Sequence, residues 1–126
     1  MLSHPRYWIK QMAEDNRVYN YLGLCARAGK LVSGADAVRA MLTKGDALVL
    51  VVTHDCSRNT LDKLLCSADR GNRKGKRAPV MYSYGNSDKL GEAIGKPART
   101  VAATGDRGFA EGLAKLLDGC VEEEKD

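Results

Sequence analysis

The chain has 126 residues, 44% of them hydrophobic, and carries 20 Lys and Arg against 16 Asp and Glu, a net charge of +4 at pH 7. This length and composition fit one globular domain and exclude a disordered chain and a two-domain enzyme. The longest apolar run, at 47–53, has the length of a strand and not the roughly 20 residues of a membrane span, so a membrane protein is excluded as well.

Helix and strand signals alternate along the chain. Residues with side-chain acceptors precede five segments of helical apolar spacing, which predicts five helix N-caps: Asp15 or Asn16, Ser33 with Asp36 in a capping-box pattern, Ser57 or Asn59, Ser87, and Asp106. Apolar and β-branched segments predict four strands: 30–32, 47–53, 79–84 and 99–104. The order α-β-α-β-α-β-α-β-α predicts an α/β fold, a three-layer α/β/α sandwich with a central four-stranded mixed sheet.

The strand expected at 47–53 reads Ala-Leu-Val-Leu-Val-Val-Thr. It is apolar at consecutive positions and does not alternate with polar residues. A strand of this kind is buried on both faces, so it is expected at the centre of the sheet.

The four cysteines contain no Cys-x-x-Cys pair, and the two histidines add no cluster of zinc-finger spacing, so no metal site is expected. Four cysteines are enough for two disulfides, so this alternative stays open. The first ten residues show no apolar segment of a secretory signal, so reduced thiols and a cytoplasmic location are expected.

The charge is distributed unevenly along the chain. From Asp118 onward, five acidic side chains stand against Lys125, a net charge of −4. Residues 1–117 carry 19 Lys and Arg against 11 Asp and Glu, a net charge of +8. A basic body of this kind suits a polyanionic partner, although charge that serves only solubility has the same composition.

The densest cationic run, at 70–77, reads Arg-Gly-Asn-Arg-Lys-Gly-Lys-Arg. Its two glycines and its asparagine disfavour a helix or strand, so the third helix is expected to end near Ala68 and the run to form an exposed flexible loop. Such a loop can lie along phosphates through charge alone, although an inert insertion has the same composition. Its cationic residues are Arg70, Arg73, Lys74, Lys76 and Arg77.

Signatures of catalysis are weak. The segment 23–30, GLCARAGK, is one residue too long for a phosphate-binding P-loop. His54 and Asp55 follow the central strand, but they have no nearby nucleophile beyond Cys56 or Ser57, and adjacent side chains at a strand end point apart. No Gly-x-Gly-x-x-Gly follows a strand, and no Gly-x-Ser-x-Gly or His-Glu-x-x-His motif occurs. The sequence therefore predicts a protein that is not an enzyme and has no cofactor.

Five segments carry a resemblance to a known family: 21–34 (YLGLCARAGKLVSG), 44–55 (KGDALVLVVTHD), 57–60 (SRNT), 89–95 (KLGEAIG) and 105–110 (GDRGFA). In order and spacing they resemble the L7Ae/L30e superfamily of kink-turn RNA-binding ribosomal proteins, and most of all its small bacterial YlxQ-like branch. The resemblance spans about residues 17–118. It implies the three-layer sandwich and an RNA-binding protein without catalysis. It also implies one RNA-binding domain over 1–126, with a core at about 15–118 and an acidic tail at 119–126.

The main RNA determinant of this family is a Gly-x-Asn-Glu-x-x-Lys pattern at the start of the second helix. The matching stretch here keeps Gly34 but has Asp36, Ala37 and Ala40 at the Asn, Glu and Lys positions. An ionised Asp only accepts hydrogen bonds, whereas Asn also donates, and the two alanines remove a carboxylate and a cation. Arg39 is adjacent to the lost lysine, but about 100° around the helix. Reduced selectivity for a kink-turn is therefore expected.

The resemblance implies further RNA contacts. His54 and Asp55 occupy a loop where the family has an acidic pair, and Lys89, Leu90 and Gly91 match a helix-entry motif. The segment 103–108, which matches a loop that packs against a flipped-out nucleotide, supplies Thr104 and Arg107. The candidate RNA-binding residues are in full Lys30, Ser33, Gly34, Asp36, Ala37, Arg39, Lys44, His54, Asp55, Lys89, Leu90, Gly91, Thr104 and Arg107.

Two functions remain open at this point. The first is binding of ribosomal or other structured RNA by a monomer, in contact with the ribosome or other ribonucleoprotein components and without a membrane. The second is a protein–protein interaction module on the same fold, as in stress-response members of the superfamily. Those members are acidic, so the basic body favours RNA.

Overall fold

The computed structural model of the protein describes residues 3–4, 7–11, 14–75 and 78–120. Within these residues the chain forms five helices: α1 (Asn16–Arg27), α2 (Ala35–Lys44), α3 (Arg58–Arg73), α4 (Ser87–Ile94) and α5 (Arg107–Asp118). The same residues contain six strands: β1 (Ser3–His4), β2 (Tyr7–Gln11), β3 (Val32–Ser33), β4 (Val49–Val52), β5 (Val80–Ser83) and β6 (Val101–Thr104). None of the described helices has the length and apolar character needed to cross a bilayer.

The strands form one mixed sheet in the order β1-β2-β5-β4-β6-β3. β4 runs parallel to β5 and antiparallel to β6, and β3 runs antiparallel to β6. The ends of β3, β4 and β5 therefore meet the start of β6 at one edge, which we call the carboxyl edge. At the opposite edge, the amino edge, β4 and β5 begin and β6 ends.

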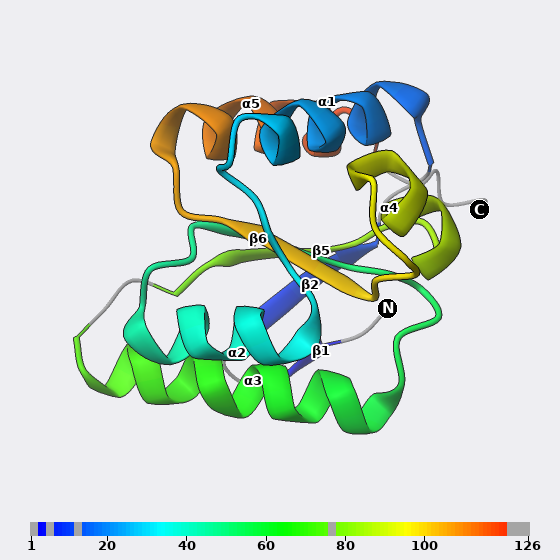
Figure 1. Ribbon diagram of the computed structural model, residues 1–126. Helices are drawn as coiled ribbons and strands as arrows, with labels where there is room; N and C mark the ends of the chain where they lie inside the picture. The colour runs from blue at the N-terminus through cyan, green and yellow to red at the C-terminus, as the bar shows by residue number, and fades with distance from the viewer. Residues whose placement is uncertain (1–2, 5–6, 12–13, 76–77, 121–126) are drawn as a thin grey trace, which may run out of the picture.

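The helices cover both faces of the sheet, with α1, α4 and α5 on one side and α2 and α3 on the other (Figure 1). Side chains of β4 alternate between the two layers. Val49 and Val51 belong to the apolar cluster under α1, α4 and α5, whereas Leu50 and Val52 belong to the cluster under α2 and α3. All four side chains are buried, which confirms the predicted central strand and the predicted three-layer sandwich.

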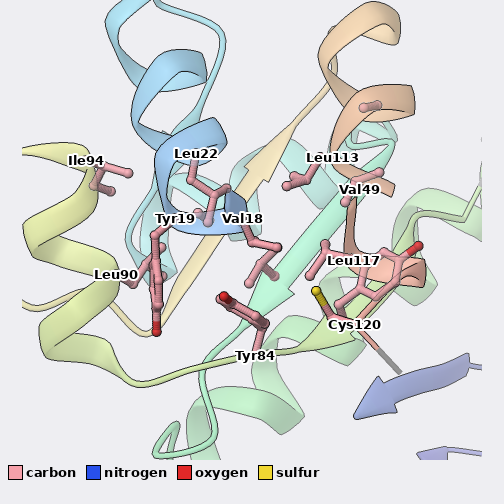
Figure 2. Close-up of a cluster of buried hydrophobic side chains, with 14 residues drawn as sticks. Val18, Tyr19, Leu22, Val49, Tyr84, Leu90, Ile94, Leu113, Leu117 and Cys120 are labelled. Atoms are coloured by element: carbon pink, nitrogen blue, oxygen red, sulfur yellow. The ribbon is translucent and has the colours of Figure 1, made fainter. Parts of the chain in front are cut away.

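The cluster under α1, α4 and α5 is built at helical spacing (Figure 2). Val18 and Leu22 of α1, Leu90 of α4, and Leu113 and Leu117 of α5 are each no more than 1% exposed. Burial of one such side chain contributes roughly 1.5–3 kcal/mol relative to leaving it in water. The three helices are thus held to the sheet by apolar burial along one stripe of each helix.

The sheet is wider than the sequence predicted. β2 pairs in parallel with β5, with Ile9 opposite Met81, and β1 pairs antiparallel with β2. Ile9 is buried in the cluster under α2 and α3. The four predicted strands correspond to β3, β4, β5 and β6, and within the described residues an N-terminal segment that carries no long apolar run adds β1 and β2 beside β5.

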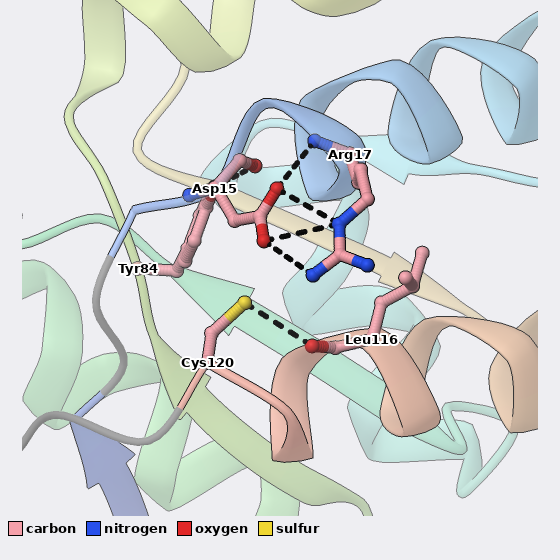
Figure 3. Close-up of polar contacts among 5 residues, drawn as sticks. All are labelled: Asp15, Arg17, Tyr84, Leu116 and Cys120. Atoms are coloured by element: carbon pink, nitrogen blue, oxygen red, sulfur yellow. Dashed lines mark hydrogen bonds and ion pairs between the residues drawn. The ribbon is translucent and has the colours of Figure 1, made fainter.

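The start of α1 is attached to the end of β5 (Figure 3). The hydroxyl of Tyr84 donates to the backbone carbonyl of Asp15 and accepts from its N–H, and the carboxylate of Asp15 accepts from the N–H of Arg17 at 2.8 Å. The Arg17 guanidinium lies 2.7 Å from the same carboxylate and, as its main hydrogen-bond donor, lowers the pKa of Asp15 to about 2. These contacts confirm Asp15 as the first predicted N-cap.

Tyr84 should make the fold sensitive to alkali. Burial raises the pKa of its phenol to about 12, above the ordinary value of 10.0. Because the unfolded chain ionises first, the stabilisation from this group is complete below pH 10 and is lost as the pH rises toward 12. We expect the unfolding midpoint in urea to fall across this window, and to fall less in Tyr84→Phe. A titration in which the ultraviolet absorbance of tyrosinate shows every tyrosine ionising at the ordinary pKa, while the protein is still folded, would contradict this.

Three helix starts agree with the sequence and two do not. Asp15, Ser57 and Asp106 cap α1, α3 and α5 through side-chain oxygens, as predicted. Asn86, and not Ser87, caps α4 by accepting from the N–H of Lys89. The capping box predicted at Ser33 does not form, because Gly34 is the N-cap of α2 and no side chain in the described part of the chain caps this helix.

The cationic run at 70–77 is only partly a loop. α3 continues through Arg73 and ends at Lys74, so the expectation of a flexible loop from residue 70 is wrong for its first half, and Lys76 and Arg77 lie outside the described residues. A side chain at Gly71 would place its Cβ 2.3 Å from the carbonyl oxygen of Leu42. The glycine thus lets α3 approach α2 closely, and this packing overrides its poor helix propensity.

Candidate nucleic-acid interface

The first turn of α2 lies at the carboxyl edge and begins at Gly34. This glycine has φ 95°, a backbone conformation that residues other than glycine rarely adopt. Its N–H donates to the carbonyl of Val101 at 3.0 Å. Since none of the described side chains caps α2, its first N–H groups are left for water or a ligand. A helix start of this kind attracts anions such as phosphate.

Arg99, which the sequence did not single out as a binding residue, lies over this helix start. Its Nε is 3.8 Å from the position that a Cβ on Gly34 would take. Its Nη1 donates to the carbonyl of Ala98 at 3.3 Å, while its buried Nε has no hydrogen-bond partner among the described residues. An unsatisfied buried donor favours a ligand with acceptor oxygens. The available signal was the cationic segment 96–99, which joins a helix end to a strand.

His54 and Asp55 also lie at the carboxyl edge, as exposed residues after β4. The ring Nδ1 of His54 is 2.8 Å from the hydroxyl of Ser83. The carboxylate of Asp55 accepts from the N–H of Ser87 at 3.0 Å and from its hydroxyl at 2.7 Å. These bonds tie the loop after β4 to the start of α4, so part of the acceptor capacity of Asp55 is already used.

The motif Lys89-Leu90-Gly91 on α4 is mainly structural. Lys89 is exposed, with its Nζ 3.1 Å from a carboxylate oxygen of Glu14. Leu90 is buried in the core, and Gly91 is buried where an added Cβ would lie 2.2 Å from the carbonyl oxygen of Pro97. Leu90 and Gly91 therefore face protein, and Gly91 packs against the turn before Arg99.

A hollow of about 330 Å³ lies close to Gly34, between the end of α1, β3 and the turn after α4. Ser33, which is half-buried, contributes to its wall. Arg27 and Lys96 give the wall a positive character. The lining residues are Ala26, Arg27, Leu31, Ser33, Ile94, Gly95 and Lys96.

The predicted contacts Lys30, Lys44, Thr104 and Arg107 lie at the amino edge and not beside Gly34. β6 runs antiparallel to β4, so the loop after β6 lies where β4 begins, and the loop before β6 lies at the carboxyl edge. Thr104 is fully buried, and its hydroxyl donates to the carbonyl of Lys30 at 2.7 Å. Its hydroxyl is thus used within the protein, while Lys30, Lys44 and Arg107 are exposed.

The outer surface of α2 connects the two edges. Asp36, Ala37 and Ala40 are exposed along it. Arg39 is half-buried and turned toward α3, where its Nε donates to the hydroxyl of Ser67 at 3.4 Å. Arg39 therefore does not occupy the position of the cation that Ala40 lacks.

Comparison with known proteins decides the family. The model of the ribosomal protein L7Ae/L30e/S12e/Gadd45 family matches residues 16–112. The chain belongs to this family. The matched segment of this L7Ae-family chain runs from the start of α1 into α5, and so contains the whole carboxyl edge.

Two curated relatives are named RNA-binding protein YlxQ. The one from Bacillus subtilis (strain 168) is 41% identical over 98 residues, which are 77% of this chain and 91% of the relative. The one from Enterococcus faecium is 31% identical over 110 residues, which are 86% of this chain and 100% of the relative. These matches agree with the resemblance to the YlxQ-like branch.

Solved structures show the same L7Ae-family fold. A protein with unknown function from Bacillus halodurans C superposes with a TM-score of 0.68 at 30% identity, over 82% of this chain and 99% of the other. The Giardia lamblia 15.5kD RNA binding protein superposes with a TM-score of 0.63 at 17% identity, over 94% of this chain and 100% of the other. At 17% identity, the similarity to the Giardia protein shows a shared fold.

Proposed function

We propose that the protein is a non-catalytic RNA-binding protein, consisting of one RNA-binding domain, which holds structured RNA of the kink-turn type at the carboxyl edge. The observation that carries the proposal is the uncapped start of α2 at Gly34 with the Arg99 guanidinium beside it, in a chain of the L7Ae family. The helix start offers N–H donors to a phosphate or base edge, and Arg99 offers a charge-assisted donor. The family and the names of the two curated relatives support RNA as the ligand.

The RNA surface proposed here is smaller than the set of residues taken from the sequence. It consists of exposed or half-buried residues at the carboxyl edge: Ser33, Gly34, Asp36, Ala37, His54, Asp55, Lys89, Lys96 and Arg99. Two acidic side chains, Asp36 and Asp55, lie among its cations. Such a surface should bind RNA with moderate affinity, and the side chains missing at Ala37 and Ala40 should lower its selectivity for a kink-turn over a plain duplex.

Arg99 gives a direct test of this site. A hydrogen bond from a charged group contributes about 1.5–3 kcal/mol, so Arg99→Gln should weaken RNA binding roughly ten- to a hundredfold. A matched control is Lys115→Gln, which removes one positive charge from an exposed position on α5. The measurement is a fluorescence titration of a labelled kink-turn RNA at one salt concentration. Equal affinities for both variants would remove Arg99 and the start of α2 from the interface.

The cellular setting is part of the same proposal. The four cysteines are free thiols, and Cys66 is exposed on α3, which suits a reducing compartment. We therefore place the protein in the cytoplasm, as a monomer that acts on ribosomal RNA or on RNA of another ribonucleoprotein. Co-sedimentation of the protein with ribosomal particles at low salt tests this setting.

A further inference from the structure

Positive charge gathers on the layer formed by α2 and α3. These two helices hold six Lys and Arg against three Asp and Glu, whereas α1, α4 and α5 together hold five against four. Lys74, the C-cap of α3, adds another positive charge to the first layer. Figure 1 shows α2 and α3 side by side on one side of the sheet. The excess charge of the body is thus concentrated on one face of the molecule.

Ion pairs neutralise two of the four cations of α3. Arg58 Nε lies 3.4 Å from a carboxylate oxygen of Asp62, and Arg73 Nη2 lies 3.1 Å from one of Asp69. Both pairs join positions one turn apart on the same helix. The two acidic residues of α3 are therefore matched by these two arginines, and the remaining cations of the helix keep their full charge.

The remaining cations, Lys63 and Arg70, lie on the outward side of α3 next to α2. They are seven positions apart, nearly two full turns, so they share a face of the helix. Ser67 lies between them, within about 60° of each, and accepts from the Nε of Arg39 on α2 at 3.4 Å. Both Lys63 and Arg70 are exposed, and neither has an ion pair within the described part of the chain. We call Arg39, Lys63 and Arg70 the α2–α3 seam.

The seam continues to the amino edge. A Cβ on Gly71 would meet the carbonyl of Leu42 and the backbone N of Gly45, so the last turn of α3 lies directly against the end of α2. Lys74 therefore extends the seam at this end, and Lys44 lies at the same end on the exposed side of α2; both are exposed. From Lys63 to Lys74 the helix rises about 16 Å, which is long enough to face more than one phosphate of a nucleic-acid strand.

We propose that the α2–α3 seam is a second RNA contact, which holds the phosphates of a helical stem while the start of α2 binds the bent part of the same RNA. The inference rests on the proposed function and adds the stem as the feature recognised. Past Asp36 in the first turn, the exposed side chains of α2 before Lys44 are the methyl groups of Ala37 and Ala40. An RNA backbone can therefore follow α2 closely from the carboxyl edge to Lys44.

The test compares two double variants of the same helix. Lys63→Gln/Arg70→Gln removes two cations from the seam, and Arg58→Gln/Arg73→Gln removes two from the ion-paired side. Gln keeps good helix propensity at these exposed positions, so both proteins should melt like the wild type. The probe is a kink-turn RNA with a long flanking stem, titrated over a series of salt concentrations.

Each phosphate contact contributes about 0.7–0.9 to the slope of log affinity against log salt. The seam variant should therefore lose roughly 1.5 units of slope, and the control should lose less than about half a unit. Shortening the stem should lower the slope of the wild type at least as far as that of the seam variant, because it also removes the contacts of Arg39 and Lys74. Equal slopes for the two variants would overturn the seam while leaving RNA binding intact. A wild type that binds no RNA would overturn the seam and the proposed function together.

Discussion

The triple variant Asp36→Asn/Ala37→Glu/Ala40→Lys should bind a kink-turn RNA roughly ten to a thousand times more tightly than the wild type. The positions lie along the exposed side of α2 that begins at the carboxyl edge. Each good base contact contributes about 1–3 kcal/mol of discrimination, and two of the residues replaced are methyl groups where the family pattern has a carboxylate and an ammonium. The change restores the side chains that this pattern contains.

Plain duplex RNA is the control for the triple variant. The net charge changes by only +1, so affinity for the duplex, which follows net charge, should hardly change. The single variant Asp36→Asn has the same change in net charge and should gain much less for the kink-turn. A triple variant with equal gains on both RNAs would show that charge alone was responsible, and that the start of α2 does not read the bend.

Leu22→Ala should destabilise the fold by about 2–5 kcal/mol. Leu22 is fully buried in the cluster between α1 and the sheet, and removal of a buried leucine side chain loses its transfer free energy and leaves a cavity. For a chain of marginal stability this is a large part of the total. Urea unfolding followed by circular dichroism measures the change.

Leu24, two residues further along the same helix, is the matched control. It is 47% exposed, so Leu24→Ala removes the same atoms at little cost, within about 0.5 kcal/mol, and alanine has the higher helix propensity. The difference in unfolding free energy between the two variants tests which side of α1 faces the sheet. Similar losses at both positions would mean that the apolar stripe of α1 is placed wrongly.

The parts of the fold that could be predicted from the sequence are those in which local pattern and burial agree. The apolar run around β4 and the caps Asp15, Ser57 and Asp106 were found because each signal is local. The extension of α3 past Ala68 was not found, since Gly71 is a poor helix former whose place in the helix depends on contact with α2. β2 was also missed, because its pairing with β5 joins segments about 70 residues apart.

The segments that form the candidate site could be predicted from the sequence, but not which of their residues lie together on one surface. The sequence indicated Gly34 and the loop after β4, and the structure brings both to the carboxyl edge. Thr104 and Arg107 were assigned to the same surface, although both lie at the amino edge, where β6 ends. Only the antiparallel direction of β6 shows this, and the sequence does not reveal strand direction. Arg99 was overlooked for the same reason, since only the sheet topology places the loop before β6 beside Gly34.

One measurement tests the central claim most directly: titration of the wild-type protein against a kink-turn RNA, a plain duplex and a single strand at one salt concentration. Binding to all three is expected, tightest for the kink-turn, with a preference over the duplex that stays small because Ala37 and Ala40 lack the polar groups of the family pattern. No binding to any RNA would contradict the account. A preference of several decades for the kink-turn would contradict the part played by α2.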